Sequence, residues 1–361
     1  MKAKSKIEMT SQAKKFGFSA LAAGAVFQLF TGCAMEHESM ENPSSVPIAA
    51  IDFPALFVVN GGSNSLTVVN ASTNEVAGTI SLKNATYPHH AYLNPDGSRL
   101  SLAVPGMDLS GGHGGTMADH KMGGSVLLLE TTTGQTKAAR MFDSPNHNAA
   151  FSPDGKEIWT SQMASPGKVL VLDAGTLATR KTIEVGNMPA EVTFTRSGKY
   201  AFVANGQSNS VTVIDAASGT VAKTIPVGTN PVGAWPGNDS IMYVDNEDAK
   251  TITAIHEGTL EAVRTYDLGF TPGMAATSPN GELWVTDAQN GKVVFYPPGS
   301  ATLSGNLATG AGAHGIVFGK DGTTAYVSNQ GAGTVSIIDV AGKSVKKILR
   351  VGDKPNGMAI R

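Results

Sequence analysis

Residues 201–233 read AFVANGQSNSVTVIDAASGTVAKTIPVGTNPVG, and residues 325–360 read AYVSNQGAGTVSIIDVAGKSVKKILRVGDKPNGMAI. The two stretches align as copies of one unit. The glycine after the last apolar run of the unit marks further copies, at Gly186, Gly228, Gly269, Gly310 and Gly352. Successive glycines are 41 or 42 residues apart, which is the period of a four-stranded propeller blade.

Each unit contains four short apolar runs separated by Gly, Asn, Asp, Ser or Pro. In the unit that starts at Ala190 these runs are AEVTFT, KYAFVAN, SVTVID and VAKTIPV. Their alternation and their β-branched residues predict strands. Because the strands are short and evenly spaced, with no convincing helical period after residue 50, we expect an all-β fold of radially repeated sheets.

The repeat count predicts a seven-bladed β-propeller over residues 53–361, with strands A to D running outward from a central channel. The chain enters at LFVVN (56–60), which matches a B strand, and ends at NGMAIR (356–361), which matches an A strand. The C-terminal inner strand should therefore complete the blade begun by the N-terminal strands, closing the ring and removing open edges. The three tryptophans fall on strands and are interpreted as packing residues: Trp159, Trp235 and Trp284.

The first 32 residues predict a bacterial lipoprotein signal peptide. Five lysines precede an apolar stretch at 16–30, and LFTGC at 29–33 places a small residue before Cys33, the one cysteine of the chain. Cys33 would carry the lipid, and residues 33–52 would form a flexible tether. The alternative is an ordinary signal peptide with an incidental cysteine. A membrane-spanning anchor is disfavoured because the apolar stretch is short.

This reading places the protein in the bacterial cell envelope, lipid-anchored on the periplasmic side or at the outer-membrane surface. The membrane is then one partner, and a protein could bind a face of the propeller. The whole chain has 27 Lys and Arg against 29 Asp and Glu, a net charge of −2, and loss of residues 1–32 makes it more acidic. Nucleic acid is therefore excluded as a partner on electrostatic grounds.

The repeat resembles the YVTN family of seven-bladed propellers, which are often exported prokaryotic proteins. Residues 326–329 read YVSN, and VSIID (335–339) and VG (351–352) follow at the family spacing. More distantly, the chain is similar to the haem d1 propeller of cytochrome cd1 nitrite reductases and to 6-phosphogluconolactonase-type propellers. The Asn, Asp and Gly residues of the motif are interpreted as turn formers: Asn205, Asp215, Asp339 and Gly228.

Blade 2 carries an insertion at 105–124, PGMDLSGGHGGTMADHKMGG, between its B and C strands. Its glycines predict a pliable loop, and its sequence offers no apolar residue expected to hold it against the core. Long loops on repeat scaffolds often carry function. The donors that the insertion offers to a metal are His113, His120, Met107, Met117 and Met122.

Three histidines occupy one repeat position at the start of an A strand, namely His89, His147 and His314, and His90 follows the first of them. Strand order puts the B-to-C insertion on the same face of the ring as these D-to-A positions. The sequence therefore predicts a cluster of imidazole and thioether groups at one mouth of the channel. The candidate ligands are His89, His147, His314, His113, His120, Met107, Met117, Met122 and His90.

Imidazole and thioether without thiolate suit copper, and Cu(I) in particular. Zinc and haem are weaker alternatives for the same histidines. The loop residues could instead be incidental, in which case the face would serve a binding role without metal. Glu191, one place beyond the aligned position in blade 4, is the carboxylate nearest to this arc of histidines and would be the candidate for acid–base chemistry.

Signatures of common enzymes are missing, since the chain has no CxxCH, GxSxG or HExxH motif. GAGAHG at 310–315 fits a dinucleotide fingerprint but joins two predicted strands, so it is rejected. Two classes of function stay open. The favoured one is an envelope-anchored binding module that handles copper. The other is an enzyme: a redox or electron-transfer protein with a haem or copper centre, or a lactonase-like hydrolase.

Overall fold

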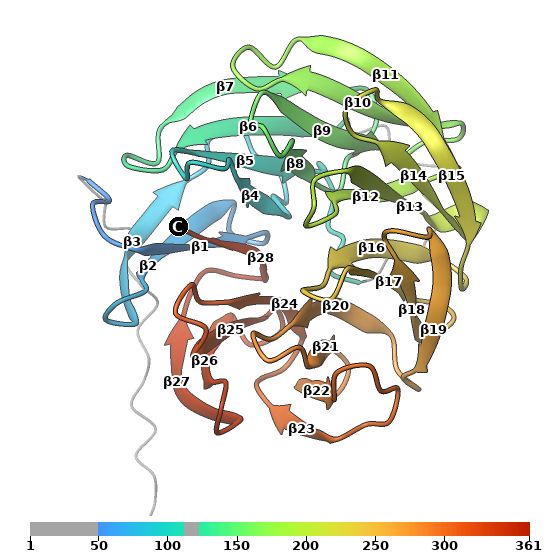
Figure 1. Cartoon of the computed structure of the whole chain (residues 1–361). Coiled ribbons are helices and arrows are strands. Elements are labelled where there is room, and N and C mark those ends of the chain that lie inside the picture. The colour runs from blue at the N-terminus through green and yellow to red at the C-terminus, as the bar shows by residue number, and fades with distance from the viewer. Residues whose placement is uncertain (1–49, 112–122) are drawn as a thin grey trace, which may run out of the picture. The chain divides into compact units, whose positions relative to one another are not determined.

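The computed structural model describes residues 50–111 and 123–361, so the predicted signal peptide and lipid site, most of the tether and the centre of the insertion lie outside it. Within these ranges, seven four-stranded antiparallel sheets are arranged as blades around a common axis (Figure 1). This confirms the all-β seven-bladed propeller. One 3-10 turn, η2 (Gly206–Ser208), is the single helical element of the described part.

The strands follow the chain blade by blade, each blade running A to D outward except blade 1, which begins with the last strand. Blade 1 consists of β28 (Pro355–Ile360), β1 (Ala55–Asn60), β2 (Ser65–Asn70) and β3 (Glu75–Ser81), and blade 2 of β4 (Ala91–Leu93), β5 (Arg99–Val104), β6 (Ser125–Glu130) and β7 (Thr136–Met141). Blade 3 consists of β8 (Ala149–Phe151), β9 (Glu157–Gln162), β10 (Gly167–Asp173) and β11 (Thr179–Val185), and blade 4 of β12 (Pro189–Phe194), β13 (Tyr200–Asn205), β14 (Ser210–Asp215) and β15 (Thr220–Pro226). Blade 5 consists of β16 (Pro231–Pro236), β17 (Ile241–Asn246), β18 (Thr251–His256) and β19 (Glu261–Asp267), and blade 6 of β20 (Pro272–Thr277), β21 (Leu283–Asp287), β22 (Lys292–Tyr296) and β23 (Gly305–Ala308). Blade 7 consists of β24 (Ala313–Phe318), β25 (Thr324–Asn329), β26 (Thr334–Asp339) and β27 (Ser344–Arg350).

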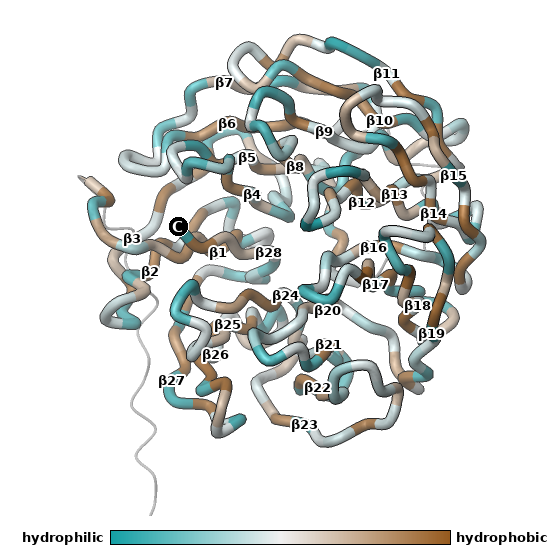
Figure 2. Tube along the Cα trace, in the orientation of Figure 1, coloured by the Kyte–Doolittle hydropathy of each residue, from teal (hydrophilic) through white to brown (hydrophobic). Residues whose placement is uncertain are grey.

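The burial of each strand follows its place in the blade. The B and C strands are buried along almost their whole length because a neighbouring blade covers each face, whereas a D strand such as β27 alternates with solvent. Leu56 and Val58 of β1, for example, pack against Tyr326 and Val335 of blade 7. Figure 2 shows hydrophobic residues along the strands and hydrophilic residues in many of the turns.

The ring closes as the sequence predicted. Strand β28 pairs antiparallel with β1, with Leu56 opposite Ile360, so the C-terminal strand is the inner strand of the blade that the N-terminal strands begin. The Arg361 side chain donates hydrogen bonds to the carbonyl oxygens of Ile51 and Phe53, at 2.7 and 2.8 Å. Both ends of the described propeller are therefore fixed to each other.

The repeat glycines have a packing role, and Gly228 also lies in the bend between β15 and β16, in line with the turn role expected for it. A Cβ atom on Gly186 or Gly228 would lie 2.7 or 2.8 Å from Asn205 or Asn246 of the next blade. Asn205 is not a turn residue, because it ends β13 and its Nδ2 donates to Thr212 Oγ1 at 2.9 Å. We call such a contact between blades a Gly–Asn joint, and Gly310–Asn329 and Gly352–Asn60 repeat it.

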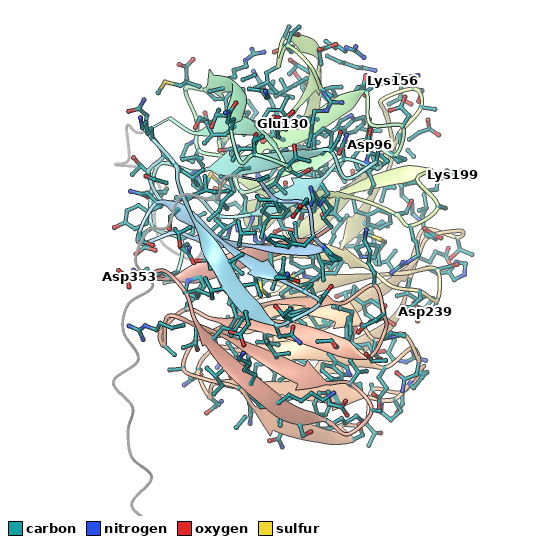
Figure 3. The ribbon with its side chains drawn as sticks, turned by 90° about the vertical axis from the view of Figure 1, so that its left-hand side faces the viewer. Asp96, Glu130, Lys156, Lys199, Asp239 and Asp353 are labelled. Atoms are coloured by element: carbon teal, nitrogen blue, oxygen red, sulfur yellow. The ribbon has the colours of Figure 1, made fainter. Side chains whose placement is uncertain are left out.

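The turn role holds for Asp215 and Asp339, whose carboxylates accept hydrogen bonds from the backbone N–H groups of Ser218 and Gly342 at 2.9 and 2.6 Å. Connections between strands divide between two faces of the ring. Figure 3 shows Asp96, Lys156, Lys199 and Asp239 of the A-to-B turns on one side and Asp353 of a D-to-A connection on the other. We call these sides the A–B face and the D–A face.

Candidate metal centre

Three histidines from two blades meet at the D–A end of the channel. His89 and His90 precede β4, and His147 precedes β8. The ring centroids are 4.3 Å apart for His89 and His147, 4.5 Å for His89 and His90, and 5.1 Å for His90 and His147. One nitrogen from each ring can be chosen so that all three lie within 4.8 Å of one another, and all three residues are buried.

The fourth predicted histidine of the arc lies beside this cluster. His314 is the second residue of β24, and its ring centroid is 6.0 Å from that of His89 and 6.3 Å from that of His90. Its carbonyl oxygen accepts a hydrogen bond of 2.6 Å from Thr286 Oγ1 of the preceding blade, which fixes the backbone at this point. The repeat alignment therefore brought His89, His147 and His314 to one place.

Glu191 ties two of the histidines together from blade 4. Its Oε1 lies 3.1 Å from Nε2 of His90 and 3.1 Å from Nδ1 of His147, and the carboxyl group is fully buried. When both nitrogens carry a proton, Glu191 accepts from both, which orients the two rings. Burial raises the pKa of Glu191 well above its usual range, and the charge of Asp245 raises it further.

Asp245 and Trp235 of blade 5 form the next layer. Trp235 Nε1 donates a hydrogen bond of 2.8 Å to Asp245 Oδ1, and the indole ring lies 6.1 Å from the His90 ring. Burial raises the pKa of Asp245 well above its usual range, with Glu247 as a further cause and the Trp235 hydrogen bond acting against them. All three tryptophans pack in the core as the sequence predicted, and Trp235 in addition lies behind the site.

Burial likewise raises the pKa of the Tyr92 hydroxyl, and the nearby Glu191 adds to the effect. Asn148 Nδ2 lies 3.3 Å from this hydroxyl oxygen and 2.9 Å from the carbonyl oxygen of Val192, which it can donate to. The layer around the histidines is thus a network of polar groups without water-exposed charge.

At one repeat position near the start of the inner strands, three consecutive blades have polar residues and the other four have glycine or methionine. The residues one place after the aligned position are His90, Asn148 and Glu191 in blades 2 to 4, and Gly233, Met274, Gly315 and Gly357 in blades 5, 6, 7 and 1. A Cβ atom on Gly357 would lie 2.5 Å from His90 Nδ1, so only glycine leaves room for that ring. At this position the polar residues therefore lie in three consecutive blades, and Gly357 of the adjoining blade 1 makes room for one of them.

The ends of the insertion lie on the D–A face. The Gly124 N–H donates to Ser144 O at 2.9 Å, beside a D-to-A connection, and the Lys354 ammonium pairs with Asp108. Leu109 is buried, contrary to the expectation that no apolar residue holds the insertion. Met107 is half-buried, whereas the other predicted ligands of the insertion lie outside the described residues: His113, His120, Met117 and Met122.

The sequence showed that Glu191 and His90 share a repeat position. It could not predict the contact between them, because that contact depends on the direction of the two side chains. Asp245 lies on a B strand, where the alignment of A strands gave no signal. His256 ends β18, the C strand of blade 5, and its Nδ1 accepts a hydrogen bond from the Gly258 N–H at 3.1 Å.

Within residues 50–111 and 123–361, no helix is long and apolar enough to cross a membrane.

No family model matches the chain, and no curated protein matches it. Solved structures do. The periplasmic gluconolactonase PpgL of Pseudomonas aeruginosa is 18% identical with a TM-score of 0.69, over 85% of this chain and 98% of that one. Hydrazine synthase of Kuenenia stuttgartiensis is 18% identical with a TM-score of 0.69, over 85% and 99%.

A third similar structure is the dihydro-heme d1 dehydrogenase NirN in complex with DHE. It is 15% identical with a TM-score of 0.61, over 88% of this chain and 77% of that one. The likeness shows the fold. At these identities the propeller is common to all four proteins, and the chemistry of this chain has to be argued from its own residues.

Proposed function

We propose that this propeller binds a transition-metal ion at the D–A mouth of its channel, through His89, His90 and His147, and that the ion is copper. The observation that carries the proposal is the convergence of three buried imidazoles whose ligand atoms can lie within 4.8 Å of one another. Three histidine nitrogen donors make a common metal-binding set.

The donor chemistry supports copper before zinc. Imidazole suits copper, zinc, iron and nickel, and the Irving–Williams order gives Cu(II) the highest affinity among the divalent ions. The one cysteine of the chain is Cys33, which the proposed lipid anchor would use. Thioether groups of the insertion would add soft ligands for Cu(I), as the sequence suggested.

Glu191 supports the proposal from the layer behind the ligands. Metal-ligating histidines commonly donate their second N–H to a carboxylate, which fixes the tautomer and raises the basicity of the ligand nitrogen. Its Oε1 stands 3.1 Å from a nitrogen of each of two cluster histidines, which is the geometry of that arrangement. The bound ion would supply an electrophilic or redox-active centre, and the protein would hold and orient it.

The place of action follows from the N-terminal sequence. The LFTGC motif and the YVTN-like repeat support an exported lipoprotein anchored through Cys33, acting in the cell envelope. A copper-handling module there would present its D–A face to the ion or to a partner protein. These are proposals about the whole chain and rest on residues outside those the structure describes.

The test is metal content and visible spectrum of the purified chain after loading with Cu(I), Cu(II) or Zn²⁺ and gel filtration. We expect near-stoichiometric copper, lost in a His89→Ala/His147→Ala double variant. His256→Ala is the matched control, because that histidine lies on a C strand away from the channel. Equal metal in the double variant and the control, with both folded by circular dichroism, would contradict the proposal.

A haem centre is the second candidate, and His314 favours it. This imidazole stands apart from the trio, at 6.0 Å from His89, and could act as an axial ligand. A Soret band after loading with haem, absent in His314→Ala, would favour the redox protein over the copper module. Hydrolysis of a sugar lactone by the metal-free chain would favour the hydrolase instead.

A further inference from the structure

The A–B end of the channel contains a second cavity, of about 380 Å³, on the side opposite the mouth that the histidines occupy. Its lining residues come from the inner strands β16, β20 and β24 and from the A-to-B turns that follow β12, β16 and β20. Figure 1 shows these three inner strands next to one another around the axis. A volume of this size is within the range of pockets that bind small molecules. The metal proposal does not use this cavity.

The walls of the cavity are apolar. Trp235, Met274, Ile316 and Phe318 line it, with small alanine side chains between them. Trp235 is held in place by its hydrogen bond of 2.8 Å to Asp245, so one wall is a rigid aromatic surface. Flat aromatic and aliphatic groups pack well against such walls.

The rim provides a single charge. Among the described residues that line the cavity, Arg196 is the one ionisable side chain. Its Nε donates a hydrogen bond of 3.1 Å to Gly237 O of the next blade, which holds the guanidinium at the rim while its two Nη groups are the part not committed to that bond. An anchored guanidinium fork is suited to a carboxylate, which it can bind through two parallel hydrogen bonds.

The neighbouring polar groups at the rim already bond within the protein. Asn238 donates through Nδ2 to Ser278 O at 2.9 Å and through its backbone N–H to Thr277 Oγ1 at 3.1 Å. These bonds join blades 5 and 6 and stiffen the rim, so the groups that make them are already used within the protein. The charge of Arg196 is therefore the feature that selects the ligand.

We propose that this cavity binds a small organic acid with a flat apolar body, its ring between Trp235 and Phe318 and its carboxylate on Arg196. This site goes beyond the proposed function and does not depend on it. The metal would be held at one end of the channel and the acid at the other, with Trp235 between them, since its ring also lies 6.1 Å from His90.

The test is isothermal titration calorimetry of the purified, metal-free chain with 2-naphthoate, and with 2-naphthylmethanol as the neutral counterpart. We expect binding of the acid, and binding of the alcohol that is about tenfold weaker or more, because a charge-assisted pair is lost. Arg196→Gln should weaken the acid to the level of the alcohol. Arg264→Gln, on the outer strand β19, removes the same charge away from the cavity and should change nothing.

The location is tested by Ala276→Leu, which adds volume to the cavity wall and should weaken both compounds. Circular dichroism and thermal unfolding confirm that each variant is folded. Absence of naphthoate binding at low millimolar concentration would overturn the proposal. So would equal binding of acid and alcohol, or binding that neither Arg196→Gln nor Ala276→Leu alters. Loss of copper binding in the same preparations would bear on the metal proposal alone.

Discussion

The two halves of the channel are built on the same repeat position and contain opposite chemistry. Blades 2 to 4 place His90, Asn148 and Glu191 there, whereas blades 5, 7 and 1 place glycine there and blade 6 places Met274. This position lies within the inner strand of blades 4, 5, 6, 7 and 1, whereas in blades 2 and 3 it lies just before the shorter inner strands β4 and β8. The comparison teaches that the repeat provides positions and that departures from it provide chemistry.

The Gly–Asn joints between blades also differ from one part of the ring to another. Gly–Asn joints connect blades 3 to 4, 4 to 5, 6 to 7 and 7 to 1. Blades 2 and 3 end their B strands in Val104 and Gln162 where the joint would need Asn. These are the blades that contribute the three clustered histidines, and blade 6, which ends its B strand in Asp287, is the other blade that lacks the joint.

Deleting the C-terminal strand should open the ring and destabilise both halves of the channel together. Deleting residues 355–361 removes β28, exposes the inner edge of β1 and takes away the Arg361 hydrogen bonds. We expect loss of cooperative unfolding and aggregation, since an open edge strand invites pairing with other chains. Arg361→Ala is the control and should unfold cooperatively at a somewhat lower temperature. A truncated chain that unfolds like the control would contradict this account of closure.

Replacing Glu191 should damage the polar half alone. Glu191→Gln replaces the carboxyl group that contacts both His90 and His147, and we expect copper affinity to fall about 10- to 100-fold. Competition with a chelator of known affinity measures the change. Glu184→Gln, an exposed carboxylate on β11, should leave the affinity unchanged. Equal affinities of the two variants would remove Glu191 from the site.

A larger residue at Gly357 should disturb His90 at the boundary between the neighbouring blades 1 and 2. In Gly357→Ala the new Cβ would lie 2.5 Å from His90 Nδ1 and 3.0 Å from His89 O. We expect a loss of about 1–3 kcal/mol in the free energy of unfolding, the cost of overpacking. Denaturant titration measures it. Gly305→Ala meets only Phe295 at 3.8 Å and should cost little or nothing, so similar losses in both would rule out the clash.

The buried acid behind the site should make stability depend on pH. The pKa of Asp245 is raised by burial in the folded state, so folding favours its protonated form. Its contribution is fully present below the unfolded pKa and is lost as pH rises through the folded pKa. Asp245→Asn keeps an oxygen for Trp235 and should gain stability relative to wild type as pH rises above about 4. A difference between the two proteins that stays constant from pH 4 to 8 would contradict this.

The smallest effect is expected at the surface. Lys354 and Asp108 pair on the D–A face with both side chains about a third or more exposed. An exposed pair contributes about 0–1 kcal/mol, so Lys354→Ala should change the free energy of unfolding by less than that, and less still at high salt. A larger loss would mean that this pair fixes the insertion to the propeller.

The sequence predicted the ring, its closure and the meeting of His89, His147 and His314, because periodicity fixes which residues share a level of the channel. It predicted Trp235 only as a packing residue, since spacing does not say that an indole faces both Asp245 and a cavity. The prediction that Asn205 forms a turn was wrong, and the contacts of Asn205 and Gly228 between blades were missed, because such contacts cannot be seen within one repeat. The ligands expected from 112–122 stay predictions.

The hydrogen bond from Arg361 N–H to Ala55 O, at 2.8 Å, brings the last residue beside the first strand. A short peptide linker could therefore join the two, and new ends could be cut in an exposed C-to-D turn of another blade. Such a circular permutant would keep every blade and both ends of the channel while changing which blade the ribosome delivers last. The order of the blades along the chain would then be separable from their order around the ring.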